Sequence, residues 1–457
     1  MTEKEYVLQN RKHNIYIEAA AVMIFFIAAA YFQGLYFPNR YLPANALLIV
    51  YMLYILNKRG RRLFLNAAVF PLFCFSCIYF LSVLYGVNRE GAVYEVLRIS
   101  AYLPAFIIGL LSYEFQRKYI DGAVILSGVI VSIIGLLNLS GLLNMDGTLY
   151  GGRIQSTFQY ANVTAVYLMI GVILGMKLAG SWELGAGGLS VRIYQFGNIA
   201  ANMCIYVLVC GLILTYSRGV WIVFVIFNLY AIMSRQLLQK STKIRYLYIL
   251  MISGTASVFL ASLTGKGWFM VVLLIGAGIS MLPEMFSFPP RSSLSTHHLY
   301  PNAIRLLSAI GLAAASMLHS TIFIRLSNIS FNATEWTARL AYYKGALKLI
   351  RDYPLFGSGA MGWEVLSERY AGDYVKYVHN YYLHILTDVG LVGFMFFLIF
   401  IMTIFKRYMK CKKKDIYPAL IAATILMHSL VDIDMHFQLI AIIFFFYCGV
   451  AAQVNGE

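Results

Sequence analysis

The feature that most constrains this chain is a series of long apolar runs that recur along nearly its whole length. A helix crosses the hydrocarbon core of a bilayer with about 20 predominantly apolar residues, and many of these runs approach that length. Only 12% of the residues are charged, whereas soluble domains carry roughly 25%. We therefore predict an all-α polytopic membrane protein that forms a single integral membrane domain over residues 1–457.

Fourteen runs are candidate transmembrane helices, and because several are short we expect about 12 to 14 spans. The first fourteen residues are polar and lead directly into a run of spanning length, so we expect no cleavable signal peptide. The runs cover approximately residues 15–32, 42–56, 64–84, 93–111, 120–137, 161–178, 198–216, 219–234, 246–263, 268–282, 303–319, 381–405, 416–431 and 436–453.

Basic residues predict how the chain is oriented, because they favour the cytoplasmic side of a membrane. With the N-terminus inside, every clustered basic run falls inside, including those at residues 58–62 and 406–414. We therefore expect both termini inside and a cytoplasmic linker at residues 283–302. Residues 319–380 then form one large extracytoplasmic loop, and a loop of this length is usually functional.

This loop carries its own helix signal. Tyr342, Ala346 and Leu349 mark one face of a helix, which we expect to end near Asp352 because Pro354 disfavours helical geometry in the residue before it. Glycines follow at 357 and 359 and permit a backbone course that is closed to other residues.

Several arginines and one histidine fall at the predicted outer surface. Arg218 stands between two apolar runs with almost no loop, where a charge usually marks a pathway or a ligand, although its side chain can also snorkel to the headgroups. Arg153, Arg218 and Arg339 together suit a phosphate-rich substrate, because guanidinium groups bind phosphate bidentately. His379 ends the loop and is a candidate general base, with a structural role as the alternative.

The turn of the last predicted hairpin is also polar and runs from His428 to His436. His428 and Asp432 are four residues apart and would share a helix face. Two histidines and two aspartates suit a divalent metal, and a capped, hydrogen-bonded turn is the alternative. The Cys74-x-x-Cys77 pair lies within a span and indicates neither zinc nor a disulfide framework.

Five short patterns follow one another over roughly residues 150–450. They are T-F-x-x-x-N from Thr157, S-R-G-x-W from Ser217, an arginine-led helix from Arg339 ending in D-x-P-L-x-G-x-G, H-N-x-x-L-x-x-x-x-x-G-x-x-G from His379, and H-S-x-x-D from His428. In this order and spacing they resemble the bacterial O-antigen ligase and O-antigen polymerase superfamily of membrane glycosyltransferases. One departure is an aspartate at position 388, where a glutamate is more usual.

The resemblance implies a GT-C-like helical fold that acts on glycans linked to undecaprenyl diphosphate. The reaction would take place at the outer face of the bacterial cytoplasmic membrane, without a metal or cofactor. An acceptor hydroxyl attacks the anomeric carbon of the donor sugar and the lipid diphosphate leaves, with inversion. His379 looks like the base that takes the acceptor proton, and Arg218 and Arg339 look like the pair that holds the diphosphate.

Four further residues complete the expected site. Arg153 is expected as a substrate contact, and Asn380, Tyr381 and Asp388 are expected either to bind substrate or to orient the histidine.

The motifs leave the acceptor open. We favour a polymerase that extends a surface polysaccharide from lipid-linked repeat units. Its expected surroundings are the lipid bilayer, and other polysaccharide assembly proteins are candidate partners. The first alternative is a ligase that transfers the finished glycan to lipid A core or another acceptor. The second is a transporter of lipid-linked glycans, which the lack of an internal repeat disfavours. The high positive charge does not indicate nucleic acid in a membrane protein.

Overall fold

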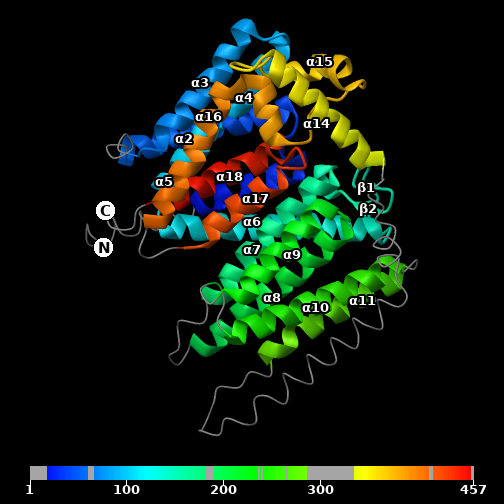
Figure 1. Cartoon of the computed structure of the whole chain (residues 1–457). Helices are drawn as coiled ribbons and strands as arrows, with labels where there is room; N and C mark the ends of the chain where they lie inside the picture. Colours follow the sequence, from blue (N-terminus) through cyan, green and yellow to red (C-terminus); the bar gives the residue numbers. More distant parts are fainter. Residues whose placement is uncertain are drawn as a thin grey trace, which may run out of the picture. The chain divides into compact units, whose positions relative to one another are not determined.

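The computed structural model describes residues 18–59, 66–181, 190–234, 237, 240–262, 266–285, 334–410 and 415–453. Its described residues are mostly helical, with one pair of two-residue strands, which confirms the all-α prediction (Figure 1). Six described helices are long and apolar enough to cross a membrane, and six shorter helices are also apolar. Every predicted run within the described residues coincides with helix. The run at 303–319 lies outside the described residues, and so does the linker at 283–302 apart from its first three residues.

The chain divides into two compact units that alternate along the sequence. The first unit comprises Met1–Tyr31 with Lys118–Ser330, and the second comprises Phe32–Arg117 with Phe331–Glu457. The sequence patterns that begin at Thr157 and Ser217 therefore lie in the first unit, and the three that begin at residues 339, 379 and 428 lie in the second.

The first unit is built around α7, which is buried on nearly every side and packs along α8. A helix that is apolar all round is expected at such a central place. In turn, α8 contacts α10 and α11. The elements of this unit are the helix Glu18–Tyr31, most of α6 (Glu114–Leu139), β1 (Leu149–Tyr150), β2 (Arg153–Ile154), η3 (Ser156–Phe158), α7 (Ala161–Ser181), α8 (Ser190–Leu214), α9 (Arg218–Met233), α10 (Lys240–Ser262) and α11 (Lys266–Met285).

In the second unit α5 packs against α18, α3 against α16, and α14 against α15 (Figure 1). The predicted run at 93–111 is divided into two helices, α4 and α5, by a break at Ser100 and Ala101. The elements of this unit are η1 (Gln33–Leu35), α2 (Pro38–Arg59), α3 (Val69–Tyr85), α4 (Arg89–Ile99), α5 (Tyr102–Leu111), α14 (Thr334–Asp352), α15 (Gly362–Ala371), α16 (Tyr381–Lys410), α17 (Tyr417–His428), η5 (Asp434–His436) and α18 (Gln438–Ala451).

The predicted loop helix is α14, and it ends at Asp352 as expected. Its residues Ala346 and Leu349 are fully buried against Trp363 of α15 and Val378. No sequence signal indicates α15, which lies in the stretch of mixed composition between the glycines and His379. The described part of the predicted outer loop is thus a small packed layer of two helices.

The helix α16 is broken where the glycine segment meets it. At the break Gly390 has φ 62° and ψ −164°, outside helical geometry. The amides of Leu391 and Val392 then donate to the carbonyls of Pro354 and Leu355, at 2.9 and 3.1 Å. Segment 354–359 therefore supplies the hydrogen-bond partners that the interrupted helix cannot, which fixes the approach of α14 to α16.

Gly359 allows an equally close approach on its other side, to the end of α3. Its φ is 89°, and a Cβ atom there would collide with the Cα of Gly86. Gly372 has a similar φ of 88°, but a Cβ there would meet nothing within 4 Å. The two glycines thus share a left-handed conformation, and they differ in whether backbone fills the space beside them.

We predict that Gly359→Ala lowers the thermal unfolding temperature of the purified protein far more than Gly372→Ala. Gly372→Ala should cost only the left-handed backbone penalty of about 1–2 kcal/mol. Gly359→Ala adds a backbone collision of about 1–3 kcal/mol or more. Thermal unfolding in detergent measures both, and equal shifts would show that the contact with Gly86 is not tight.

Candidate active site

His379 occupies a constrained turn immediately before α16. Its φ of 57° lies in the left-handed region, where residues other than glycine are uncommon and often functional. The side-chain oxygen of Asn380 accepts from the amides of Tyr382 and Leu383, both at 3.0 Å. Asn380 therefore caps the start of α16, and this cap fixes the turn from which the histidine projects.

Asp432 joins this histidine to Arg339 of α14. Its Oδ1 lies 3.4 Å from His379 Nδ1 and accepts from the amide of Ile433 at 2.8 Å. Its Oδ2 lies 3.3 Å from Arg339 Nη2, and Arg339 Nη1 also donates to the carbonyl of Val431 at 2.5 Å. One carboxylate thus orients both of the side chains that the sequence predicted for this unit.

The carboxyl group of Asp432 is ionised. Burial alone would raise its pKa, but the hydrogen bond to His379 and the positive charge of Arg339 outweigh burial and hold the pKa of Asp432 well below its usual value. A lowered folded-state pKa means that ionisation stabilises the fold above the unfolded value of about 3.9, and that this contribution is lost only at more acidic pH. Asp432 therefore keeps its negative charge at physiological pH. Arg339, Asp432 and His379 are called the triad below.

Two tyrosines of α14 also contact His379. The hydroxyl of Tyr343 donates to the carbonyl of His379 at 2.9 Å. The ring of Tyr342 is stacked on the imidazole, with centroids 6.3 Å apart. Tyr342 and Tyr343 lie three and four positions after Arg339, so all three residues share one face of the helix.

Exposure differs within the triad. The side chains of His379 and Arg339 are 23% and 22% exposed, whereas that of Asp432 is 0% exposed. Since Asp432 faces Nδ1, the other ring nitrogen of His379, Nε2, lies on the far side of the ring. The arrangement offers a reacting solute one imidazole nitrogen and one guanidinium, both backed by a buried carboxylate.

The hairpin turn differs from the expectation that His428 and Asp432 share a helix face. The helix α17 ends at His428, and the imidazole Nδ1 lies 2.7 Å from Asp434 Oδ2 instead. The carbonyl of Ser429 accepts from the amide of Tyr381 at 2.8 Å, which ties the turn to α16. The structure therefore has the hydrogen-bonded turn that the sequence analysis gave as the alternative to a metal site. Asp432 contacts His379 instead of His428.

Two of the residues that were expected either to bind substrate or to orient the histidine are buried. Tyr381 is 4% exposed and Asp388 is fully buried. The Asp388 carboxylate accepts from the amide of Met361 at 3.1 Å, and its carbonyl accepts from Gly359 at 3.0 Å. Asp388 thus holds the glycine segment on the broken helix.

The other two predicted arginines lie in the first unit. Arg153 on β2 donates through Nε to the carbonyl of Thr215 and through Nη2 to Asn162, both at 3.0 Å. Arg153 therefore joins the start of α7, at Asn162, to the turn before Arg218. After Tyr216, whose φ is 53°, Arg218 opens α9 with an exposed side chain.

Sequence reasoning missed the role of Asp432 and of the two tyrosines. The sequence analysis gives Asp432 as a candidate metal ligand and as part of the H-S-x-x-D pattern, but does not pair it with His379, which lies 53 positions away. The available signal was chemical: a histidine base needs an orienting acceptor, and the late H-S-x-x-D pattern supplied an acidic residue.

Comparison with known proteins adds one finding. Residues 203–398 match a family model described as O-antigen ligase, and no curated protein that was compared matches the chain. The matched region is less than half of the chain. It contains Arg218, Arg339 and His379 but ends before Asp432. The match confirms the predicted resemblance of this multi-pass membrane protein to the O-antigen ligase and O-antigen polymerase superfamily over residues 203–398.

Proposed function

We propose that this protein is a membrane glycosyltransferase that polymerises undecaprenyl-diphosphate-linked repeat units into a surface polysaccharide. The observation that carries this proposal is the buried Asp432 carboxylate bridging His379 and Arg339. It combines a proton acceptor with a phosphate-binding cation, and glycosyl transfer from a lipid diphosphate needs both.

In the proposed reaction the acceptor hydroxyl gives its proton to His379 Nε2. Its oxygen forms a bond to the anomeric carbon as the bond from that carbon to the diphosphate oxygen breaks, with inversion. Asp432 stabilises the imidazolium that results and fixes the ring orientation, as expected of the acid that supports a histidine base. No residue becomes covalently attached to the sugar, and the electron pair leaves with the lipid diphosphate.

Arg339 is the proposed partner of the leaving diphosphate in the second unit. Its guanidinium is held in place by Asp432 and the Val431 carbonyl, so little reorganisation is needed when charge develops on the phosphate. Arg218 is the proposed second cation. Arg153 donates to the carbonyl of Thr215 and so fixes the turn before Arg218. We therefore propose that Arg153 positions Arg218, in addition to its proposed contact with substrate.

The proposed site faces the outside of the bacterial cytoplasmic membrane, with both termini inside. Within the second unit α16 begins at the His379 turn and runs 30 residues to Lys410. At about 1.5 Å per residue it is long enough to cross a bilayer. Its far end carries Lys406, Arg407 and Lys410, and such basic ends favour the cytoplasm.

The description of the matched family favours a second candidate, an O-antigen ligase that transfers a finished glycan to another acceptor. The two activities share the donor, the base and the leaving group, so the triad serves either of them. They differ in the acceptor, and therefore in the product that a defective variant leaves behind.

We predict that His379→Ala lowers the rate of glycan transfer by at least about 100-fold, because the acceptor loses its base. Tyr343→Phe removes only the hydrogen bond to the His379 carbonyl and should cost less than about tenfold. The measurement is product formed by proteoliposomes supplied with lipid-linked donor. Full activity of His379→Ala at normal membrane levels would contradict the assignment.

Arg339→Ala should abolish transfer, whereas Arg351→Ala on the same helix should not. The Arg351 side chain is 84% exposed, so this control removes an equal charge from α14 without touching Asp432. Arg339→Lys should recover part of the rate, because the charge remains and the bidentate geometry is lost. Equal losses in Arg339→Ala and Arg351→Ala would mean that only the net charge of α14 matters.

The glycan that accumulates in cells carrying His379→Ala should be single lipid-linked repeat units at the outer face, as expected for a lost polymerase. The measurement is gel analysis of lipid-linked and surface glycans. Long chains that remain on the lipid carrier would instead assign the ligase activity. Accumulation only at the inner face would contradict both and indicate transport.

A further inference from the structure

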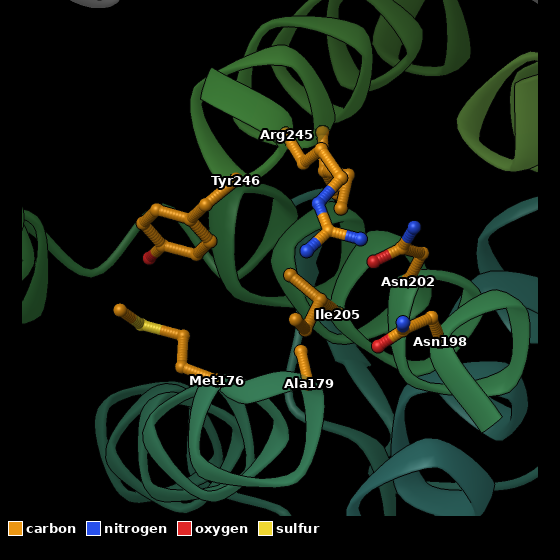
Figure 2. A pocket seen from close by; sticks show the side chains of 8 residues that line it. Met176, Ala179, Asn198, Asn202, Ile205, Arg245 and Tyr246 are labelled. Carbon is orange, nitrogen blue, oxygen red and sulfur yellow. The ribbon is translucent and has the colours of Figure 1, made fainter. Parts of the chain in front are cut away.

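Buried polar side chains without partners differ in what would satisfy them. In the first unit Asn198 and Asn202 line a pocket between α7, α8 and α10 (Figure 2), and each has an amide atom without a partner among the described residues. The pocket has room for about one water, which satisfies neutral amides. In the second unit Asp434, in the turn after α17, also has an atom without a partner among the described residues. A buried carboxylate needs a compensating charge, which water does not supply.

Asp434 is the less compensated of the two buried carboxylates in this turn. Asp434 and Asp432 are both 0% exposed, and Asp432 is balanced by Arg339 at 3.3 Å. Among the described residues no lysine or arginine forms an ion pair with Asp434, and its Oδ1 has no hydrogen-bond partner. Its Oδ2 lies 2.7 Å from Nδ1 of His428 and 3.5 Å from the hydroxyl of Ser429. Balancing the charge of Asp434 therefore falls to His428.

His428 balances this charge when the pair holds one proton between Nδ1 and Oδ2. An imidazole binds a proton more tightly than a carboxylate, with reference pKa values of about 6.5 and 3.9, so the proton belongs on His428. A distance of 2.7 Å suits such a charge-assisted hydrogen bond. Among the described residues, the other titratable groups that face His428 are Asp432 and Arg339, whose charges balance each other. The turn is then neutral as a whole, and the proposed reaction can use His379 as an uncharged base.

The same pair fixes the course of the turn that carries Asp432. The contact between His428 and Asp434 spans six positions, and Asp432 lies within the turn that it closes. Inside this turn the His428 carbonyl accepts from the amide of Val431 at 2.9 Å, and the Val431 carbonyl accepts from Arg339. The turn thus presents both acceptors of Arg339, the Val431 carbonyl and the Asp432 carboxylate, to α14.

We propose that His428 and Asp434 are positioning residues, in which a protonated His428 balances Asp434 and so keeps Asp432 available to His379 and Arg339. This inference rests on the proposed function, because it takes His379 as the base. Without the charge on His428 the turn would hold one uncompensated negative charge, and a proton at His379 would compensate it. The base would then be blocked at neutral pH.

The first test is the pH dependence of glycan transfer by the full-length protein in proteoliposomes. His428→Asn keeps an N–H group at the position of Nδ1 but cannot carry a charge, so the acid limb of the pH–rate profile should move by about one pH unit to higher pH. The double variant with His428→Asn and Asp434→Asn removes both charges and should return the limb to its original place. Ser429→Ala removes only a neutral contact of Asp434 and should leave the limb where it is.

The double variant separates this proposal from a purely structural role. If the pair only braces the turn, each substitution weakens the same turn, and the double variant should be slower than His428→Asn at every pH. That order would overturn the proposal. An unmoved acid limb in His428→Asn would also overturn it, because Asp434 would then hold the proton itself.

The second measurement needs no substrate. A proton that the folded pair holds and the unfolded histidine releases stabilises the fold below the unfolded pKa of about 6.5, and this contribution is lost as the pH rises above that value. The thermal unfolding temperature in detergent should therefore fall more steeply above about pH 6.5 in the unmodified protein than in the double variant. Equal slopes would overturn the proposal. A steeper slope without any glycan transfer by the unmodified protein would contradict the proposed function alone, and the proton-holding pair would stand.

Discussion

The carboxylate of Asp432 is the interaction on which the proposed site depends. A buried, ionised carboxylate is costly unless each oxygen has partners. Here Oδ1 faces His379 and the Ile433 amide, and Oδ2 faces Arg339. Because α14, the turn before α16 and the turn after α17 each contribute one partner, the three segments must assemble for the charge to be buried. The folding requirement and the chemical requirement are therefore met by the same contacts.

The glycine segment and the break in α16 give those contacts their geometry. Segment 354–359 bonds to the interrupted helix around Gly390, and Asp388 anchors the same loop through the Met361 amide. This docking sets the position of α14, and hence of Arg339 and Tyr343, relative to the start of α16. Residues that resembled a substrate site in the sequence, such as Asp388, serve this positioning from a fully buried place.

Hydropathy was sufficient to predict the helical membrane fold, and Pro354 to predict the end of α14 at Asp352, because both features depend on local sequence. The roles of His379 and Arg339 came from their residue types and from the resemblance. The part that could not be predicted is non-local: Asp432 meets His379 across 53 positions, and His428 turns from Asp432 to Asp434 only because α17 ends there.

The most direct test of the account is a double-mutant cycle between Asp432→Asn and His379→Ala, with the rate of glycan transfer in proteoliposomes as the readout. If Asp432 acts through His379, Asp432→Asn should slow the His379→Ala variant much less than it slows the unmodified protein, because only its effect on Arg339 remains and residues that act as one unit are strongly non-additive. If the two losses multiply, Asp432 and His379 act independently, and the proposed coupling between the buried carboxylate and the base is wrong.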